Sequence, residues 1–201
     1  MIRHRIGPLV EPLHAAFETA RYQLGKQHAG LCDKDDPEQA WLRTHNLRSL
    51  LFRNLRDSLP ESWTLNTNHH LNGMVCLTYG SGEIQVRMLH QMGDDRIPIA
   101  GHNAARIAYY SNKALSELTD PHHLPTHRLI GVWSEPAEEE PFIIDVIRSV
   151  TPGRINRRVK TDLDIPLPRM RTAFEDMRFD TRDDDEQLDF DIDEKDLGTD
   201  E

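Results

Sequence analysis

The sequence predicts an α+β fold: a mostly antiparallel sheet of five or six strands, packed by two N-terminal helices and one central helix. Apolar residues recur at helical spacing in two segments before residue 60, and β-prone segments separated by short turns follow them. The helical segments are grouped and do not alternate with single strands, which is typical of α+β proteins. We expect one domain over residues 1–173 and an acidic, disordered tail over residues 174–201.

Two amphipathic helices are expected at the N-terminal end. Over residues 8–28, four apolar side chains recur at spacings of four, three and four, which places them on one stripe of a helix. They are Leu13, Phe17, Ala20 and Leu24. A second helix is expected to start at Asp36, because an aspartate cap, Pro37 at the first helical position and Gln39 two residues later form a capping pattern. Its expected apolar face consists of Trp41, Leu47, Leu50, Leu51 and Leu55.

A β-hairpin is expected in the middle of the chain, after a strand that starts at Trp63. Segments 74–79 and 83–89 are apolar or β-prone, and Gly80-Ser81-Gly82 between them supplies the positive backbone φ that tight turns require. In the second segment apolar and polar residues alternate, so one face is expected to be buried and the other to meet solvent. An isolated hairpin is only marginally stable in water, so the rest of the chain is expected to cover its apolar face.

The C-terminal half of the domain supplies the central helix and the remaining strands. A helix is expected over 103–118, followed by strands over 128–133 and 142–147, the second being the most apolar segment and therefore an interior strand. Residues 154–161 are expected to form a polar edge strand. Residues 165–168 contain two prolines, which lack the amide donor that an interior strand needs, and they are interpreted as the exit from the fold.

Charge is distributed unevenly along the chain. Residues 174–201 contain 14 acidic and 3 basic residues, and subtracting these from the chain totals of 34 and 24 leaves 20 acidic and 21 basic residues in the first 173. The domain is therefore nearly neutral, at +1, and the formal net charge of −10 arises in the tail. A segment with so many charges and so few apolar residues cannot bury enough apolar surface to fold alone.

Within the tail, apolar and acidic residues alternate after the acidic block at 183–186. In an extended strand the apolar side chains would share one face and the carboxylates the other, so this segment can add to the edge of a partner's sheet or enter a basic groove. The expected partner-binding residues are Leu188, Phe190, Ile192, Asp189, Asp191 and Asp193. The alternative is a tail that only keeps the protein soluble.

Composition and motifs argue against several classes of protein. The two cysteines, Cys32 and Cys76, form no CxxC pair, so neither a zinc knuckle nor a disulfide framework is expected. No Walker A or Rossmann motif is present, and we expect no cofactor. No apolar segment is long enough to cross a bilayer and no signal-peptide pattern is present, so we expect a cytoplasmic protein without membrane contact.

A divalent-metal-dependent nuclease or related hydrolase is an alternative interpretation of the polar residues on the predicted strands. Glu83 and Gln85 lie on one face of the second hairpin strand, and Asp145 lies on the most apolar strand. Metal-assisted phosphodiester hydrolysis needs several converging oxygen ligands, and with only these residues the set is incomplete. The eleven histidines include adjacent pairs at 69–70 and 122–123 but no HExxH motif, so surface positions are favoured over a metal site.

A loop-to-helix junction offers a candidate anion-binding site at His102, Asn103 and Arg106. Gly101 precedes the helix, whose first backbone amides are free to bind an anion, and Arg106 lies in the first turn. The simpler interpretation is an Asn103 cap beside a surface arginine. Farther along, a basic stretch suits either nucleic-acid phosphates or a charged edge strand. It comprises Arg148, Arg154, Arg157, Arg158, Lys160, Arg169 and Arg171.

Several of these segments together resemble a group of bacterial proteins. The segments are the strand at Trp63, Met74–Tyr79, Val86–Leu89, the junction from Gly101 to Arg106, Tyr109-Tyr110, Val132-Trp133 and the acidic C-terminus. They look like uncharacterised proteins encoded beside helix-turn-helix or zinc-metallopeptidase regulators of mobile elements. The resemblance implies a regulatory, toxin–antitoxin-like setting and carries over no functional residues.

We therefore predict a non-enzymatic regulatory or antitoxin-like protein that binds a partner protein, partly through its acidic tail. The first alternative is the metal-dependent nuclease or hydrolase described above. The second is a nucleic-acid-binding module that is autoinhibited by its own tail, because the tail's carboxylates would compete with phosphates for the basic stretch.

Overall fold

The computed structural model describes residues 1–28, 38–66, 73–91, 96–115, 118, 126–136, 140–153 and 159–177 of the 201-residue chain. The helices are α1 (Ile2–Ile6), the short 3-10 helix η1 (Gly7–Leu9), α2 (Val10–His28), α3 (Ala40–Arg56), α4 (Ala104–Tyr110) and α5 (Arg171–Asp176). The strands are β1 (Trp63–Leu65), β2 (Val75–Tyr79), β3 (Ile84–His90), β4 (His127–Ser134), β5 (Ile143–Ser149) and β6 (Thr161–Pro166).

The six strands form one mixed sheet in the order β1-β2-β3-β4-β5-β6. Every neighbouring pair is antiparallel except β3 and β4, which run parallel. A parallel pair cannot be joined by a tight turn, and the chain between these two strands accordingly carries α4. The predicted α+β class is confirmed, with a sheet that is mixed at this one pairing and antiparallel elsewhere.

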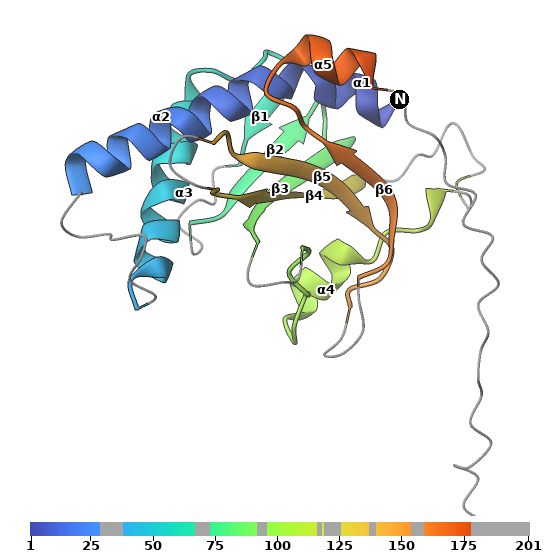
Figure 1. Cartoon of the computed structure of the whole chain (residues 1–201). Coiled ribbons are helices and arrows are strands. Elements are labelled where there is room, and N and C mark those ends of the chain that lie inside the picture. Colours follow the sequence, from blue (N-terminus) through green and yellow to red (C-terminus); the bar gives the residue numbers. More distant parts are fainter. Residues whose placement is uncertain are drawn as a thin grey trace, which may run out of the picture.

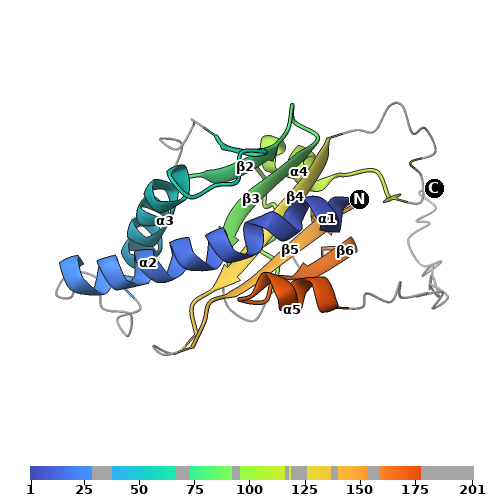
Figure 2. The same cartoon turned by 90° about the horizontal axis from the view of Figure 1, so that it is seen from above.

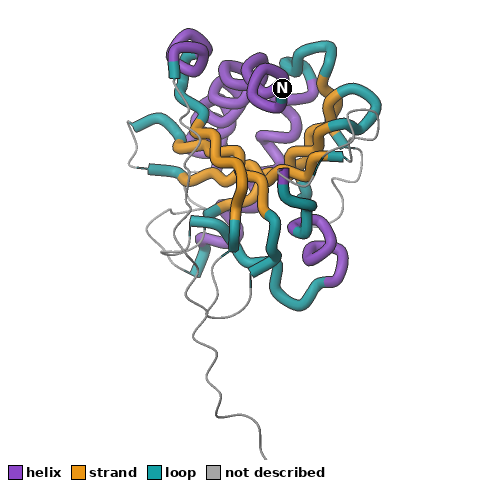
Figure 3. Tube along the Cα trace, turned by 90° about the vertical axis from the view of Figure 1, so that its right-hand side faces the viewer, coloured by secondary structure: helices purple, strands orange, loops and turns teal. Residues whose placement is uncertain are grey.

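Helices cover both faces of the sheet, so the domain has three layers (Figures 1 and 3). α1, α2 and α5 lie over one face, where α2 crosses the strands (Figure 2), and the main apolar core forms beneath them. α4 lies under the opposite face (Figure 1), where there is a second, smaller core. This second core contains Leu89, Ala100, Tyr110, Ile130, Val132 and Ile147.

β2 and β3 form the hairpin that the sequence predicts. Its turn contains Gly80 at φ +56° and Gly82 at φ +111°, backbone conformations that residues with a side chain rarely adopt. The three apolar residues that alternate along β3 are at most 2% exposed and face the main core. The polar residues between them, Gln85 and Arg87, are half-buried instead of facing open solvent, because α4 lies beneath that face of the sheet.

α2 buries the apolar stripe that its sequence predicts, since all four of its residues are at most 1% exposed. The ring centroid of Phe17 lies 5.2 Å from that of Trp133 in β4 and 4.9 Å from that of Phe142, which precedes β5. Aromatic pairs at such distances add about 0.5–1.5 kcal/mol each beyond the apolar area that they bury. Phe17 therefore anchors α2 on the two central strands of the C-terminal half.

α3 differs from its prediction at its start. The helix begins at Ala40, and its N-cap residue, Gln39, makes no side-chain capping bond; the predicted start at Asp36 and Pro37 lies outside the described residues. Trp41 is 64% exposed and not buried as expected, whereas three leucines farther along the helix are buried. Figure 1 shows the reason: α3 descends beside the sheet from the level of α2 towards the level of α4, and its first turns lie lowest.

α4 ends at Tyr110, well before the predicted end at Leu118. The side chain of Asn112 ties the following residues to the sheet: its Nδ2 donates to the carbonyls of Arg128 (2.9 Å) and Ser149 (2.8 Å), and its Oδ1 accepts from the Arg128 amide (3.0 Å). Asparagine favours such bonds to backbone groups over a place inside a helix. The chain after α4 is thereby held against β4 and β5.

The domain extends farther toward the C-terminus than predicted. The edge strand at this end of the sheet is β6, which starts at Thr161; of the predicted edge strand at 154–161, residues 154–158 lie outside the described residues. Pro166 lies at the end of this outermost strand, where a missing amide donor is tolerated. Phe174 in α5 is 2% exposed, so the expected boundary after residue 173 falls inside a helix that packs on the domain. Residues 178–201, with all the expected partner-binding positions, lie outside the described residues.

Candidate functional site

The residues of the nuclease alternative do not converge. Glu83 lies in the turn before β3 and pairs with an arginine of α1, whereas Asp145 lies within β5. Through the sheet register, Asp145 is level with Val132 of β4 and hence with Leu89 of β3. Leu89 lies six residues beyond Glu83, which is about 20 Å along a strand. Neither Glu83 nor the nearby Gln85 is therefore within reach of a metal ion held by Asp145.

Asp145 instead belongs to an ion-pair network at the sheet edge. The Nη2 of Arg96 lies 2.9 Å from Oδ2 of Asp145, and the same guanidinium pairs with Asp164 on β6. In the part of the chain that the structure describes, no group of three or more His, Cys, Asp or Glu side chains is arranged to hold a metal ion.

The basic stretch of the sequence does not form one exposed surface. Arg148 is 1% exposed and pairs with Asp162 of β6, and Arg171 pairs with Glu175 within α5. Residues 154–158, with three more arginines of the stretch, lie outside the described residues. Of the other described members, Lys160 and Arg169 are exposed. The described part of the stretch therefore mixes a buried pair, a helix pair and two exposed cations.

The residues of the predicted anion site have separate roles: Asn103 caps α4, and the Arg106 side chain lies among other cations. Asn103 is the N-cap of α4, and its side-chain oxygen accepts a hydrogen bond from the Arg106 amide at 3.0 Å. His102 and Asn103 are both exposed. Since α4 has only seven residues and its cap already uses the amide, the helix terminus itself is an ordinary capped end. Of the three predicted residues, only Arg106 belongs to a larger group of charges, and its side chain is half-buried.

That group is a cluster of three arginines from three different elements: Arg48 of α3, Arg87 of β3 and Arg106 of α4, called here the arginine cluster. All three residues are half-buried. Among the described residues, the Nε atoms of Arg48 and Arg87 are buried and have no hydrogen-bond partner. The ion pairs that form between described residues involve none of the three guanidinium groups.

The positive charges of the three arginines act on the same neighbouring groups. Burial lowers the pKa of the Arg48 guanidinium, and the positive charges of Arg87 and Arg106 lower it further. Burial raises the pKa of the neighbouring Tyr110 hydroxyl to about 12, and the charges of Arg106 and Arg87 oppose that rise. The cluster is therefore a site of concentrated positive charge that favours an anion.

Another arginine of the same helix shows how this chain pairs a guanidinium with a carboxylate. Arg43, also in α3, donates from Nε to Glu135 at 3.0 Å and from Nη2 at 2.6 Å, and both side chains are 16% exposed. This two-point contact gives the Nε of Arg43 a partner. The Nε of Arg48, by contrast, has no partner among the described residues. Unlike Arg43 and Arg148, each of which pairs with a carboxylate, Arg48 is in no ion pair between described residues.

The side chains of Tyr109, Tyr110 and Cys76 near the arginine cluster are either hydrogen-bonded to the backbone or buried. The Tyr109 hydroxyl lies 3.1 Å from the carbonyl of Gln85 and 2.8 Å from that of Leu129, and the Tyr110 hydroxyl donates to the Pro98 carbonyl at 2.6 Å. Cys76, opposite Arg87 in the sheet, is 6% exposed, and burial raises the pKa of its thiol to about 11. A neutral, buried thiol is a poor nucleophile at physiological pH. Cys76 is therefore not an activated nucleophile.

His90 stands between the arginine cluster and the main core. Its ring centroid lies 4.2 Å from that of Trp133, and its Nδ1 lies 3.5 Å from the Thr44 hydroxyl. Burial and, to a smaller extent, the Arg48 cation lower the pKa of His90 to about 4, and Glu135 opposes this shift. His90 is therefore neutral at physiological pH and adds no charge to the site.

The lowered pKa predicts that His90 makes the fold sensitive to acid. Since the unfolded chain protonates this histidine near its ordinary pKa of about 6.5 and the folded chain only near 4, the stabilisation is complete above pH 6.5 and is lost as the pH falls towards 4. Thermal unfolding between pH 4.5 and 7.5 should give a shallower pH dependence for His90→Gln than for the wild type. The variant should keep part of the pH dependence of its stability, because burial also lowers the pKa values of His14 and His127. Identical slopes for variant and wild type would rule out this role.

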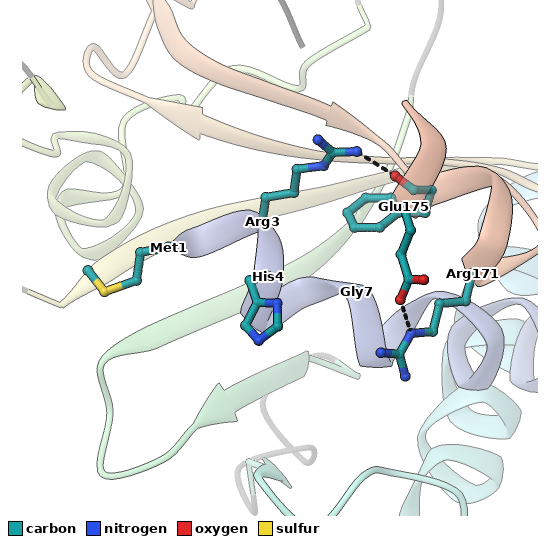
Figure 4. A pocket seen from close by; sticks show the side chains of 7 residues that line it. Met1, Arg3, His4, Gly7, Arg171 and Glu175 are labelled. Atoms are coloured by element: carbon teal, nitrogen blue, oxygen red, sulfur yellow. Dashed lines mark hydrogen bonds and ion pairs between the residues drawn. The ribbon is translucent and has the colours of Figure 1, made fainter. Parts of the chain in front are cut away.

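A separate pocket of about 360 Å³ lies between α1 and α5 (Figure 4). Arg3 donates to the carbonyls of Phe174 and Met177, and Arg171 pairs with Glu175 across its rim. The guanidinium of Arg3 also lies 5.2 Å from the ring centroid of Phe174. Arg3 therefore holds the C-terminal end of α5 on α1, whereas the Arg171–Glu175 pair lies within α5. The pocket is a junction between two helices.

Sequence reasoning identified Arg106 as a candidate site residue but missed the other two arginines of the cluster. Arg48 belongs to a series of arginines on the polar side of α3, and Arg87 alternates with apolar residues on β3, so both looked like solvent-facing positions. The available signal was the number of arginines on a helix that carries no acidic residue: 17 residues of α3 contain four arginines, one of them paired with Glu135.

None of the described helices is long and apolar enough to cross a membrane. Comparison of the chain with protein-family models, with curated proteins and with solved structures finds no match. The resemblance to uncharacterised proteins encoded beside regulators of mobile elements therefore stays a prediction.

Proposed function

We propose that this chain is a non-enzymatic regulatory protein that recognises an anionic group through the arginine cluster. The observation that carries the proposal is the pair of buried Nε atoms, on Arg48 and Arg87, that have no partner among the described residues. Burying a hydrogen-bond donor of a charged group without a partner is unfavourable. An anion that entered the cluster would satisfy both donors and offset the repulsion between the cations.

Regulation is the role that suits a site built in this way. The three guanidinium groups come from α3, β3 and α4, so a bound anion would draw together a helix beside the sheet, a central strand and the crossover helix below it. A ligand stabilises whichever conformation binds it better. Occupancy of the cluster would thus stabilise the present arrangement of these elements, and their exposed surfaces would report that occupancy to a partner protein.

The proposal is tested by thermal unfolding of the full chain in sulfate and in sodium chloride of equal ionic strength. Sulfate at ten times its Kd should stabilise the wild type by about 1.4 kcal/mol, and Arg106→Gln should remove most of this gain. Arg53→Gln is the matched control, because Arg53 is an exposed arginine on α3. Equal sulfate responses in all three proteins would contradict anion binding at the cluster, since sulfate also stabilises proteins non-specifically.

A second role, binding a partner protein through the acidic tail, is favoured by the charge distribution. A domain of charge +1 carries a segment with 14 acidic and 3 basic residues, in which apolar and acidic residues alternate over 188–193. We propose that this alternation contacts a basic surface or a sheet edge of the partner in a regulatory, antitoxin-like complex. Affinity purification should recover one dominant protein with the full chain and lose it when 183–201 are deleted. Retention of that protein by the shortened chain would exclude the tail as the contact.

A further inference from the structure

The arginine cluster also indicates which class of anion it takes. Its three arginines belong to elements on different sides of one region: α3 stands beside the sheet, β3 lies within it and α4 lies beneath it (Figure 1). A planar carboxylate offers its two oxygens in one plane and matches one guanidinium, as Glu135 does with Arg43. A tetrahedral oxyanion presents oxygens in several directions and can contact all three.

The total positive charge of the arginine cluster also favours a tetrahedral oxyanion over a single carboxylate. Arg48, Arg87 and Arg106 contribute three positive charges, and the charge of a single carboxylate would leave two of them unbalanced. Arginine is also the residue that suits planar, two-point contacts with phosphate oxygens. Resting on the proposed function, we propose that the arginine cluster binds a doubly charged tetrahedral oxyanion, namely the phosphate group of a phosphomonoester.

The protein side of this site does not titrate near neutral pH. The arginines of α3, β3 and α4 stay charged, and His90 on β3 is neutral because burial lowers its pKa to about 4. Burial raises the pKa of Cys76 on β2 to about 11 and that of Tyr110 on α4 to about 12, and it raises the pKa of Tyr109 as well. Arg128 on β4 lies near Tyr109, and Glu135 near His90 is paired with Arg43. Because sulfate stays a dianion between pH 5 and 7.5, its affinity reports any pH dependence that arises in the protein, and the additional pH dependence of phosphate binding belongs to the ligand.

The experiment compares two probes on the full chain by isothermal titration calorimetry: sulfate, which is a dianion throughout this range, and methyl phosphate, whose second pKa is near 6. Between pH 5 and pH 7.5 the affinity for methyl phosphate should rise by about tenfold, as the dianion fraction does. The affinity for sulfate should change by less than about twofold. Arg87→Gln should weaken both probes, and Arg53→Gln, an exposed arginine of α3, should weaken neither.

The same titrations separate a failure of this inference from a failure of the proposed function. A peptide with the sequence of residues 183–186 and glutarate serve as carboxylate probes. If a carboxylate probe binds in an Arg87-dependent way and the two tetrahedral dianions do not, the proposed phosphate specificity is overturned while anion recognition stands. If none of the four probes binds in an Arg87-dependent way, both the specificity and the proposed function are wrong. A methyl phosphate affinity that stays flat with pH would also overturn the requirement for a dianion.

Discussion

Asp162→Asn is expected to destabilise the domain by about 3–5 kcal/mol, the usual consequence of leaving a buried charge without its partner. Arg148 is 1% exposed, and Asp162 is the carboxylate with which it pairs. Asp162 also accepts the Leu115 amide at 2.8 Å, and the Nη2 of Arg148 donates to the Lys113 carbonyl at 2.6 Å. The pair therefore joins β5 and β6 to the chain that follows α4. For a domain of this size the midpoint of thermal unfolding should fall by roughly 6–20 °C.

Asp164→Asn is the matched control for this prediction. Asp164 lies on the same strand, two residues away, and also pairs with an arginine, but it is 41% exposed and its partner Arg96 is 46% exposed. Exposed ion pairs contribute about 0–1 kcal/mol, so the midpoint should move by only a few degrees. The double variant Arg148→Met with Asp162→Leu should recover most of the loss, because apolar groups can replace a buried pair. Equal losses for the two aspartates would show that burial does not govern the effect.

Arg48→Met is expected to have the opposite effect: in the absence of multivalent anions it should stabilise the domain by about 1 kcal/mol, because it removes part of the repulsion within the arginine cluster. Methionine keeps much of the apolar contact of the arginine stem. The midpoint of thermal unfolding should rise by roughly 2–4 °C in chloride, and the further gain that sulfate gives the wild type should disappear. A substitution that stabilises the protein while abolishing a response is typical of a residue retained for binding.

The contrary outcome for Arg48→Met is equally specific. If Arg48 were a partner in a structural ion pair, its removal would lower the midpoint and leave the sulfate response unchanged. Arg53→Met, at an exposed position one turn farther along α3, should change stability by less than about 0.5 kcal/mol. A lower midpoint for Arg48→Met than for Arg53→Met would mean that the cluster is part of the packing.

The fold could be predicted where local patterns and tertiary packing agree. The stripe of α2 is buried as its spacing predicts, and the glycine turn between β2 and β3 fixes their register. The predictions failed where a distant contact decided the outcome. α4 stops at Tyr110 because Asn112 bonds to β4 and β5, and Trp41 is exposed because α3 runs past the sheet. Neither contact leaves a local pattern in the sequence.

The candidate site was harder to predict than the fold for a related reason. Alternation along β3 assigns Arg87 to the face opposite the main core, and that face counts as solvent unless something covers it. The parallel pairing of β3 with β4 places the crossover, and with it α4, beneath this face. The sequence predicted a mostly antiparallel sheet and so gave no reason to expect a buried arginine there. One parallel pairing turns an apparently solvated arginine into part of the arginine cluster.

The most direct test of the arginine cluster is a two-dimensional NMR spectrum that correlates Nε with its hydrogen in every arginine, recorded while sulfate is added to the full chain. We predict that the signals of Arg48 and Arg87 shift together along one saturable curve, because sulfate oxygens become the partners of these two Nε–H groups. The signal of Arg43, whose Nε already donates to Glu135, should stay in place and serves as the internal reference. Saturable shifts elsewhere with no change at Arg48 and Arg87 would contradict anion binding at the cluster.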